Sequence, residues 1–379
     1  MRPLPVLLAS GLLASTSLLT GCGDDDPEPE PLGSGDDYSV LNAIGELPRS
    51  VGSDAPMIVT ADLDRATEVA GLERPGDPGS DEVMNWMTEL TATTRQGGEQ
   101  VFVPMPDELV PYQVRPADMD EQVGWSVVDV ATYASVSGPP ESFLVVSGDF
   151  DGETLSSDLA EVDDDIVTDV EAEDHEQNVQ EPTAFSRLGA PTRLAEDDGR
   201  IAASSTTDAV RDWLDGEGDS YGDDADFAEV AKALDGQDVY SAVIAPAPSG
   251  VDPAALILGT DSPPEAVDRV RDLIEGQLPE ASYDVVGIGW AQVDDGPLIT
   301  TAYHFGSDDD AEDSVDSLRE LYESGESVRS RQPYSDFIEV EDVEADGSTV
   351  VVTTRPAGDA PISFPFRALT ERDLLFVSR

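Results

Sequence analysis

Apolar residues recur every three to four positions in three segments, and this period predicts three amphipathic helices. Each segment follows a serine with an acidic residue three positions later, which is the spacing of a helix capping box. The serines are Ser205, Ser262 and Ser307. A glycine follows each apolar run and ends the predicted helix, as a residue at the C′ position does. The glycines are Gly216, Gly276 and Gly325.

Runs rich in β-branched and aromatic residues predict strands. One such run precedes each of the three helices, at 200–203, 255–258 and 298–305. The clearest hairpin joins 285–290 to 298–303 through Asp294-Asp295-Gly296-Pro297. Other predicted strands lie at 125–130, 143–146, 165–170, 239–244, 284–290, 337–343 and 349–354, and short helices at 66–71 and 81–93. A weaker helix containing Leu155 and Leu159 is expected after the strand at 143–146.

The recurring order of strand, strand and helix favours antiparallel hairpins over a doubly wound parallel sheet. We therefore predict an α+β fold with two lobes of mainly antiparallel sheet and amphipathic helices packed on one face. The length of the chain also favours two domains. We place the lobes at 38–218 and 227–379, on either side of the acidic, glycine-rich stretch 215–226.

The N-terminal segment 1–21 has the pattern of a secretory signal peptide. Arg2 makes it positive, the apolar run at 4–19 is too short to span a bilayer comfortably, and small residues follow. The sequence Leu19-Thr20-Gly21-Cys22 resembles the lipobox of bacterial lipoproteins. That resemblance implies that the Cys22 thiol takes a diacylglyceryl group and becomes the amino terminus after cleavage. Two acyl chains anchor a protein stably to a membrane. The alternative is an ordinary signal peptide followed by an unmodified cysteine.

Residues 22–37 are acidic and rich in proline, glycine and serine. Alternating prolines stiffen the extended backbone, like charges repel, and neither part can bury an apolar core. We therefore predict a tether that holds the globular part away from the membrane.

The chain carries 81 acidic and 20 basic residues, a formal net charge of −61. Nucleic-acid binding is excluded as a function class because it needs basic patches that displace counterions from phosphates. Self-repulsion of this size destabilises a compact state in dilute salt, and molar salt removes that penalty by screening. We expect a salty habitat, although a GC-rich genome would also enrich arginine and aspartate.

Motifs for chemistry are few. There is no Gly-x-Ser-x-Gly elbow, no phosphate-binding Gly-x4-Gly-Lys-Ser/Thr, and no His-Glu-x-x-His run. We expect His175 to lie in a solvated acidic loop and His304 to pack within an apolar strand. No residue is proposed as catalytic, although a carboxylate pair formed only in space is not readable from sequence.

Calcium is the one cofactor considered, because it prefers carboxylate and backbone oxygens. The candidate ligands are Asp215, Glu217 and Asp219, which alternate along one loop. Ser220 stands where an EF-hand loop has its glycine, so the loop does not complete that motif. An ordinary solvated acidic loop is the favoured interpretation.

The run from Ala61-Asp62-Leu63-Asp64-Arg65-Ala66-Thr67 to Gly71-Leu72, with the strand-to-helix units, is similar to uncharacterised lipoproteins of actinobacteria. This resemblance implies no activity. We expect a non-enzymatic lipoprotein on the outer face of the cytoplasmic membrane, whose partners are the bilayer through Cys22 and an envelope protein or small ligand. The alternatives are a carrier of a lipid or small apolar ligand and a carboxylate-dependent extracytoplasmic hydrolase.

Overall fold

The computed structural model describes residues 32–379 except 53–54, 92–100, 111–115, 181, 187, 217, 249–251, 260–261 and 275. The strands are β1 (Met57–Asp62), β2 (Val130–Gly138), β3 (Glu141–Gly148), β4 (Ala160–Asp163), β5 (Ile166–Thr168), β6 (Arg193–Asp197), β7 (Arg200–Ser204), β8 (Ser241–Pro246), β9 (Tyr283–Val293), β10 (Gly296–Phe305), β11 (Ile338–Asp346) and β12 (Thr349–Pro356). The α-helices are α1 (Val40–Gly45), α2 (Leu63–Val69), α3 (Asp81–Leu90), α4 (Pro116–Val123), α5 (Thr207–Asp215), α6 (Ala225–Asp235), α7 (Pro253–Leu258), α8 (Pro264–Ile274), α9 (Asp308–Ser324) and α10 (Phe364–Thr370). Among the described residues, no helix has both the length and the apolar character needed to cross a bilayer.

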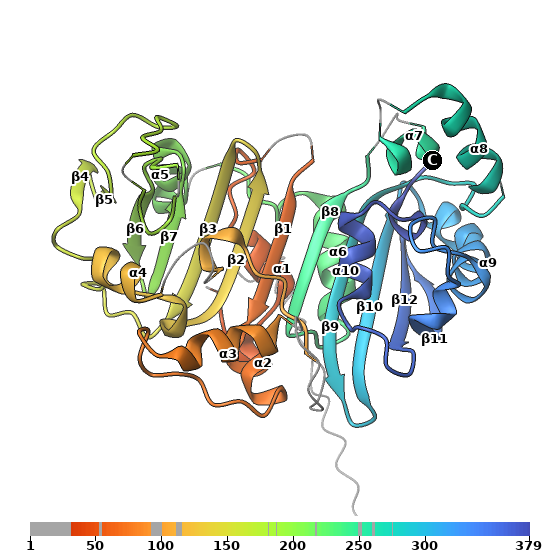
Figure 1. Ribbon diagram of the computed structural model, residues 1–379, viewed down its shortest axis with the longest axis horizontal. Coiled ribbons are helices and arrows are strands. Elements are labelled where there is room, and N and C mark those ends of the chain that lie inside the picture. The colour runs from red at the N-terminus through yellow and green to blue at the C-terminus, as the bar shows by residue number, and fades with distance from the viewer. Residues whose placement is uncertain are drawn as a thin grey trace, which may run out of the picture. The chain divides into compact units, whose positions relative to one another are not determined.

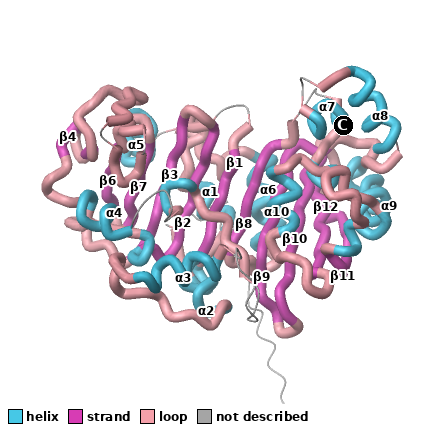
Figure 2. Tube along the Cα trace, in the orientation of Figure 1, coloured by secondary structure: helices cyan, strands magenta, loops and turns pink. Residues whose placement is uncertain are grey.

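The twelve strands form one antiparallel sheet in the order β11-β12-β10-β9-β8-β1-β2-β3-β7-β6-β5-β4 (Figures 1 and 2). The α+β class and the antiparallel sheet predicted from sequence are confirmed. The predicted hairpin is also present, because β9 and β10 are joined by a tight turn at Asp294-Asp295.

The sheet contains the same strand arrangement twice. One half runs β1-β2-β3-β7-β6 outward from the centre, and the other runs β8-β9-β10-β12-β11. A helix precedes the first strand of each half, α1 before β1 and α6 before β8. The halves meet where β1 and β8 pair antiparallel, from Ile58 opposite Ile244 to Ala61 opposite Ser241. The two predicted lobes are therefore joined through a shared sheet.

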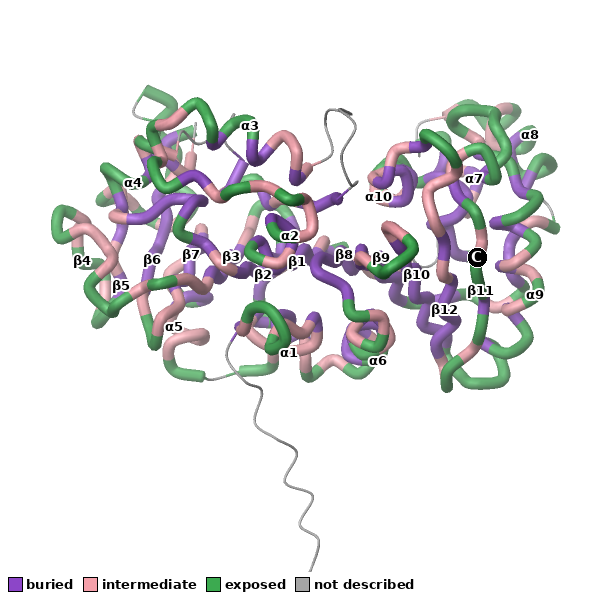
Figure 3. Tube along the Cα trace, turned by 90° about the horizontal axis from the view of Figure 1, so that it is seen from below, coloured by how far each residue is buried: buried purple, intermediate pink, exposed green. Residues whose placement is uncertain are grey.

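Helices cover both faces of the sheet, which corrects the prediction of one covered face (Figure 3). Helices α1, α5 and α6 bury apolar side chains on one face, whereas α2, α3, α4, α7, α8, α9 and α10 contribute to a larger core on the other. The residue pattern of the strands explains why both faces of the sheet are covered. A strand with one wet face alternates apolar and polar residues, but β3 buries Phe143, Leu144, Val145 and Val146 in succession.

Some local predictions are wrong where capping chemistry outweighs strand propensity. The predicted strand at 255–258 lies in helix α7, because the Asp252 carboxylate caps it and Pro253 occupies its first position. The predicted strand at 125–130 is mostly a 3-10 turn, η3 (Val127–Asp129), closed by a Ser126 and Asp129 capping box. The segment around Leu155 and Leu159 forms turns rather than a helix.

The serine caps have different outcomes. Ser307 caps α9 and accepts a hydrogen bond from the Asp310 N–H, as predicted. Helix α5 begins one residue later than expected, with Thr206 at its N-cap instead of Ser205. Ser262 does not cap α8, since its hydroxyl donates to the Leu258 carbonyl. Gly216 ends α5 in the left-handed conformation, as predicted.

Residues 32–37, predicted as part of the tether, lie on the folded body. Leu32 is buried in the core under α1, and 35–37 form the 3-10 turn η1 (Gly35–Asp37). The Gly35 N–H donates to the buried carboxylate of Asp62. Burial of Leu32 and the hydrogen bond to Asp62 attach this segment to the folded body, although its composition is that of a linker.

The two halves are also joined through helices α1 and α6. Asp235, the last residue of α6, accepts hydrogen bonds from the Ser39 hydroxyl and from the N–H groups of Val40 and Leu41. The carboxylate at the end of α6, in the second half, therefore accepts hydrogen bonds from the first N–H groups of α1, in the first half.

We predict that Asp235→Ala lowers the free energy of unfolding by about 1–3 kcal/mol, because three donors at the start of α1 lose their acceptor. Urea unfolding in molar NaCl measures this. Asp316→Ala, which removes an exposed carboxylate from α9, is the matched control. Equal midpoints for the two variants would contradict the prediction.

Candidate functional site

The residues singled out from sequence lie mostly at the surface or outside the described residues. Cys22 and Glu217 are among the residues that the structure does not describe. Asp215 and Asp219 are both exposed, at the end of α5 and in the loop after it. The calcium loop therefore stays a prediction, as does lipidation of Cys22. His175 is exposed, as expected for an acidic loop.

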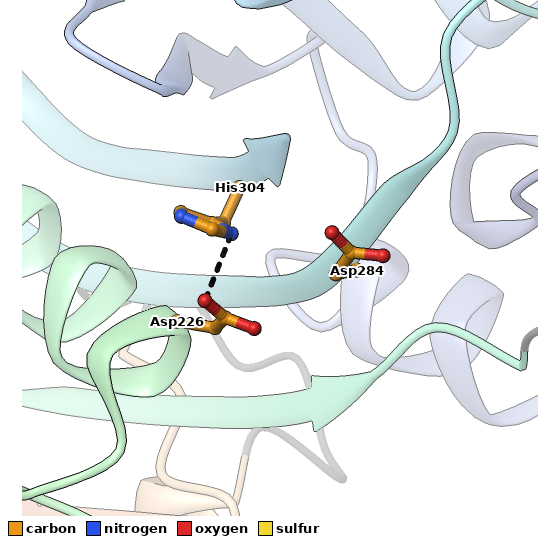
Figure 4. A group of neighbouring side chains, drawn as sticks. All are labelled: Asp226, Asp284 and His304. Atoms are coloured by element: carbon orange, nitrogen blue, oxygen red, sulfur yellow. Dashed lines mark ion pairs between the residues drawn. The ribbon is translucent and has the colours of Figure 1, made fainter. Parts of the chain in front are cut away.

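The structure places His304 beside two aspartates, which the sequence alone did not indicate. It is buried at the end of β10, with 7% of its surface exposed. Its Nδ1 atom lies 3.9 Å from Oδ1 of Asp226 and has no hydrogen-bond partner. Asp284 completes a group in which one ligand atom from each residue lies within 4.8 Å of the others (Figure 4). Among the described residues, this is a group of three side chains whose potential metal-ligand atoms lie close together.

Each residue of the group is held by a different element. Asp226 is in the first turn of α6, whose N-cap is Asp224. His304 shares a face of β10 with Leu298 and Ala302, which pack in the core under α6. Asp284 occupies a β-bulge in β9, because His304 pairs with Val285 and Phe305 pairs with Tyr283. A bulge redirects a side chain and bends its strand.

The group combines one buried nitrogen with two accessible carboxylates. Half of the Asp226 side chain is exposed, and Asp284 is exposed. One imidazole and two carboxylates are a ligand set that divalent transition metals accept. The sequence pattern indicated packing for His304 and did not indicate the group, since β8, α7 and α8 separate Asp226 from the strands that carry Asp284 and His304.

Three other carboxylates, of which Asp62 and Asp373 are buried and Asp169 is half-buried, accept hydrogen bonds from backbone N–H groups. Asp62 caps α2 by accepting from the Arg65 N–H, and it also accepts from Gly35. Asp169 accepts from the Thr192 N–H. Asp373 accepts from the N–H groups of Val328 and Leu374 and from the Tyr334 hydroxyl. Each of these three carboxylates therefore accepts a hydrogen bond from at least one backbone N–H, whereas Oδ2 of Asp169 is buried without a hydrogen-bond partner.

Described residues line three open grooves that can be compared. One of about 330 Å³ lies between α8 and α9 and includes Leu273, Leu321 and Arg331. A second, of about 480 Å³, is lined by acids of α4 and by Asp158 and Asp169. The third, of about 380 Å³, lies beside α10. All three are open to solvent and carry charged side chains.

The groove beside α10 combines two arginines and two phenylalanines with the acidic residues Glu371 and Asp373. Arg329 and Arg367 line it together with Phe337 and Phe364, whose rings stack with centroids 4.3 Å apart. The Arg367 guanidinium lies 5.6 Å from the centre of the Phe364 ring. Arginine over an aromatic surface is a common feature of ligand and protein interfaces.

No protein-family model matches the chain, and no curated protein matches it significantly. A solved structure described as crystal form I of TP0453 aligns with 83% of this chain and 93% of its own, at 9% identity and a TM-score of 0.34. At that TM-score the likeness carries no argument about fold or function.

We predict an unusual pH dependence for Asp62. Burial raises the pKa of its carboxyl, even though the N–H groups of Arg65 and Gly35 favour the charged form. The native state then keeps a proton that the unfolded chain has lost, so this group stabilises the fold less as the pH rises. The wild-type free energy of unfolding minus that of Asp62→Asn should fall as the pH rises above about 4.

Urea titrations at several pH values measure this difference. Asp316→Asn provides the matched loss of one surface carboxylate. A difference that increases with pH for Asp62→Asn would show that the carboxylate is stabilised, rather than penalised, by its burial.

Proposed function

We propose that the protein is a lipid-anchored binding protein on the outer face of the cytoplasmic membrane, with a non-enzymatic role in the cell envelope. The observation that carries this proposal is the lipobox-like sequence Leu19-Thr20-Gly21-Cys22, which follows a signal-peptide pattern and contains the sole cysteine of the chain. Lipidation at Cys22 would determine the cellular compartment in which the other surfaces of the protein meet their partners.

The length of the segment after Cys22 supports a body held close to the membrane. The folded body begins by Leu32, so the tether comprises 22–31. At about 3 Å per residue for extended proline-rich backbone, its reach is on the order of 30 Å. A partner would then be bound within roughly that distance of the lipid headgroups.

Two features support binding over catalysis. The carboxylates of Asp62, Asp235 and Asp373 accept hydrogen bonds from backbone N–H groups, which favours structural roles for them over acid–base chemistry. The groove beside α10 places two guanidinium groups beside aromatic rings, together with the acidic residues Glu371 and Asp373, and arginine with aromatic residues is common at binding interfaces. The carrier alternative would need an enclosed apolar chamber, and none of these three grooves among the described residues is of that kind.

Cys22→Ser tests the anchor. When the full chain is produced in a bacterial host, mass spectrometry of the wild type should find a diacylglyceryl adduct on Cys22 and the loss of 1–21. The Cys22→Ser variant should carry no adduct, because serine lacks the nucleophilic thiol. Thr20→Ser keeps a small residue beside the cleavage site and should be modified like the wild type. A wild-type Cys22 without an acyl group would overturn the proposal.

We also propose adaptation to high salt, supported by the net charge of −61. Raising NaCl from 0.1 M to 1 M shortens the Debye length from about 10 Å to about 3 Å, which weakens repulsion between surface carboxylates. The unfolding midpoint temperature should therefore rise over this range. Sucrose at equal osmolality is the control, because it stabilises by exclusion without screening charge. An equal rise in sucrose would contradict charge screening as the cause.

A further inference from the structure

We propose that Asp226, Asp284 and His304 form a binding site for a divalent transition-metal ion, with zinc as the representative ion. The site goes beyond the proposed envelope role, which concerns an anchor and a binding surface. Its residues come from three elements that converge at one end of the second half of the sheet (Figure 4).

The first observation is the state of the imidazole. His304 is more than nine-tenths buried, and its Nδ1 atom has no hydrogen-bond partner. A buried polar atom left unpaired costs about 1–3 kcal/mol, so native proteins rarely keep one without a reason. Nδ1 faces the Asp226 carboxylate at 3.9 Å, which is too long for a hydrogen bond. A metal ion placed between these two atoms would satisfy both.

The second observation is the spacing of the ligand atoms. The three atoms lie within 4.8 Å of one another. Zinc binds histidine nitrogen and carboxylate oxygen at about 2.0–2.2 Å, so tetrahedral ligand atoms are separated by roughly 3.4 Å. The largest of these separations must therefore contract by up to about 1.4 Å. Because His304 is fixed in the core and both carboxylates reach solvent, side-chain rotation of Asp226 and Asp284 supplies that movement.

Ligand chemistry selects the class of ion. Calcium and magnesium prefer sites made of oxygen ligands, whereas imidazole suits zinc, copper, iron and nickel. A buried nitrogen at the centre of the group therefore favours a transition metal. Three protein ligands also leave one tetrahedral position for water or for a group from a bound partner.

Electrostatics at the site are favourable on balance. The positive end of the α6 dipole opposes a cation nearby. Asp224 at the N-cap and Asp226 in the first turn place two carboxylates against that end, and Asp284 adds a third from β9. A bound ion would also tie the first turn of α6 to the ends of β9 and β10.

The chain offers a direct test because it has two histidines. Full-length protein with isotope-labelled histidine is titrated with ZnCl2, and the two imidazoles are followed by NMR. We expect the His304 resonances to change at substoichiometric to equimolar zinc, while those of His175 stay unchanged. Zinc bound by the Cys22 thiol would alter neither imidazole. CaCl2 at the same concentrations should leave His304 unchanged.

Asp226→Asn and Asp284→Asn are the test variants, since both side chains are accessible and their replacement preserves the packing of His304. Each should weaken zinc binding at His304 by at least about tenfold, as loss of a charged ligand requires. Asp316→Asn and His175→Gln should bind zinc at His304 as the wild type does. A wild-type His304 that does not respond to equimolar zinc, or test variants that bind as tightly as the controls, would overturn the proposal.

Discussion

The pairing of β1 with β8 is the contact on which the rest of the structure depends. It joins two halves that each repeat the same order of five strands, and it lies at the centre of the twelve-stranded sheet. Both faces of this junction are covered, since Ile58 and Ile244 belong to the core under α1 and α6 while Val59 and Val243 belong to the opposite core. A central strand pair buried on both faces has no water to replace its backbone hydrogen bonds, so opening the junction would be costly.

Carboxylates have two separate uses in this chain. Most of the 81 acidic residues form the charged surface, whereas a few buried ones satisfy backbone donors where the chain begins a helix or changes direction. Asp235 is the most consequential of these because it connects α6 to α1 across the two halves. His304 differs from these carboxylates, because its buried Nδ1 atom has no hydrogen-bond partner. The imidazole lies beside two accessible carboxylates.

Much of the fold was predictable where the signal is local. The β9 and β10 hairpin, the Ser307 cap and the Gly216 helix end follow from turn and capping chemistry within a few residues. Strand β1 was missed, and α7 was assigned as a strand, because a short apolar run is compatible with either element until its cap is considered. The second covered face was not predicted from helix period, since it depends on which strands become central.

The proposed metal site could not be predicted from sequence for a related reason. Asp226, Asp284 and His304 meet only after α6 packs on the sheet and the bulge in β9 places Asp284 near the end of β10. In a chain with 81 acids, spacing along the sequence does not distinguish these two aspartates from the others. Leu32 likewise joins the core although it lies in a segment with the composition of a linker.

Native-state hydrogen exchange at β1 and β8 tests the central claim most directly. If the junction holds the two halves together, the paired amides between 58–61 and 241–244 should be among the slowest in the chain and exchange only through global unfolding. Rapid exchange at these amides while β3 and β10 stay protected would show that the halves separate readily, and it would contradict the account.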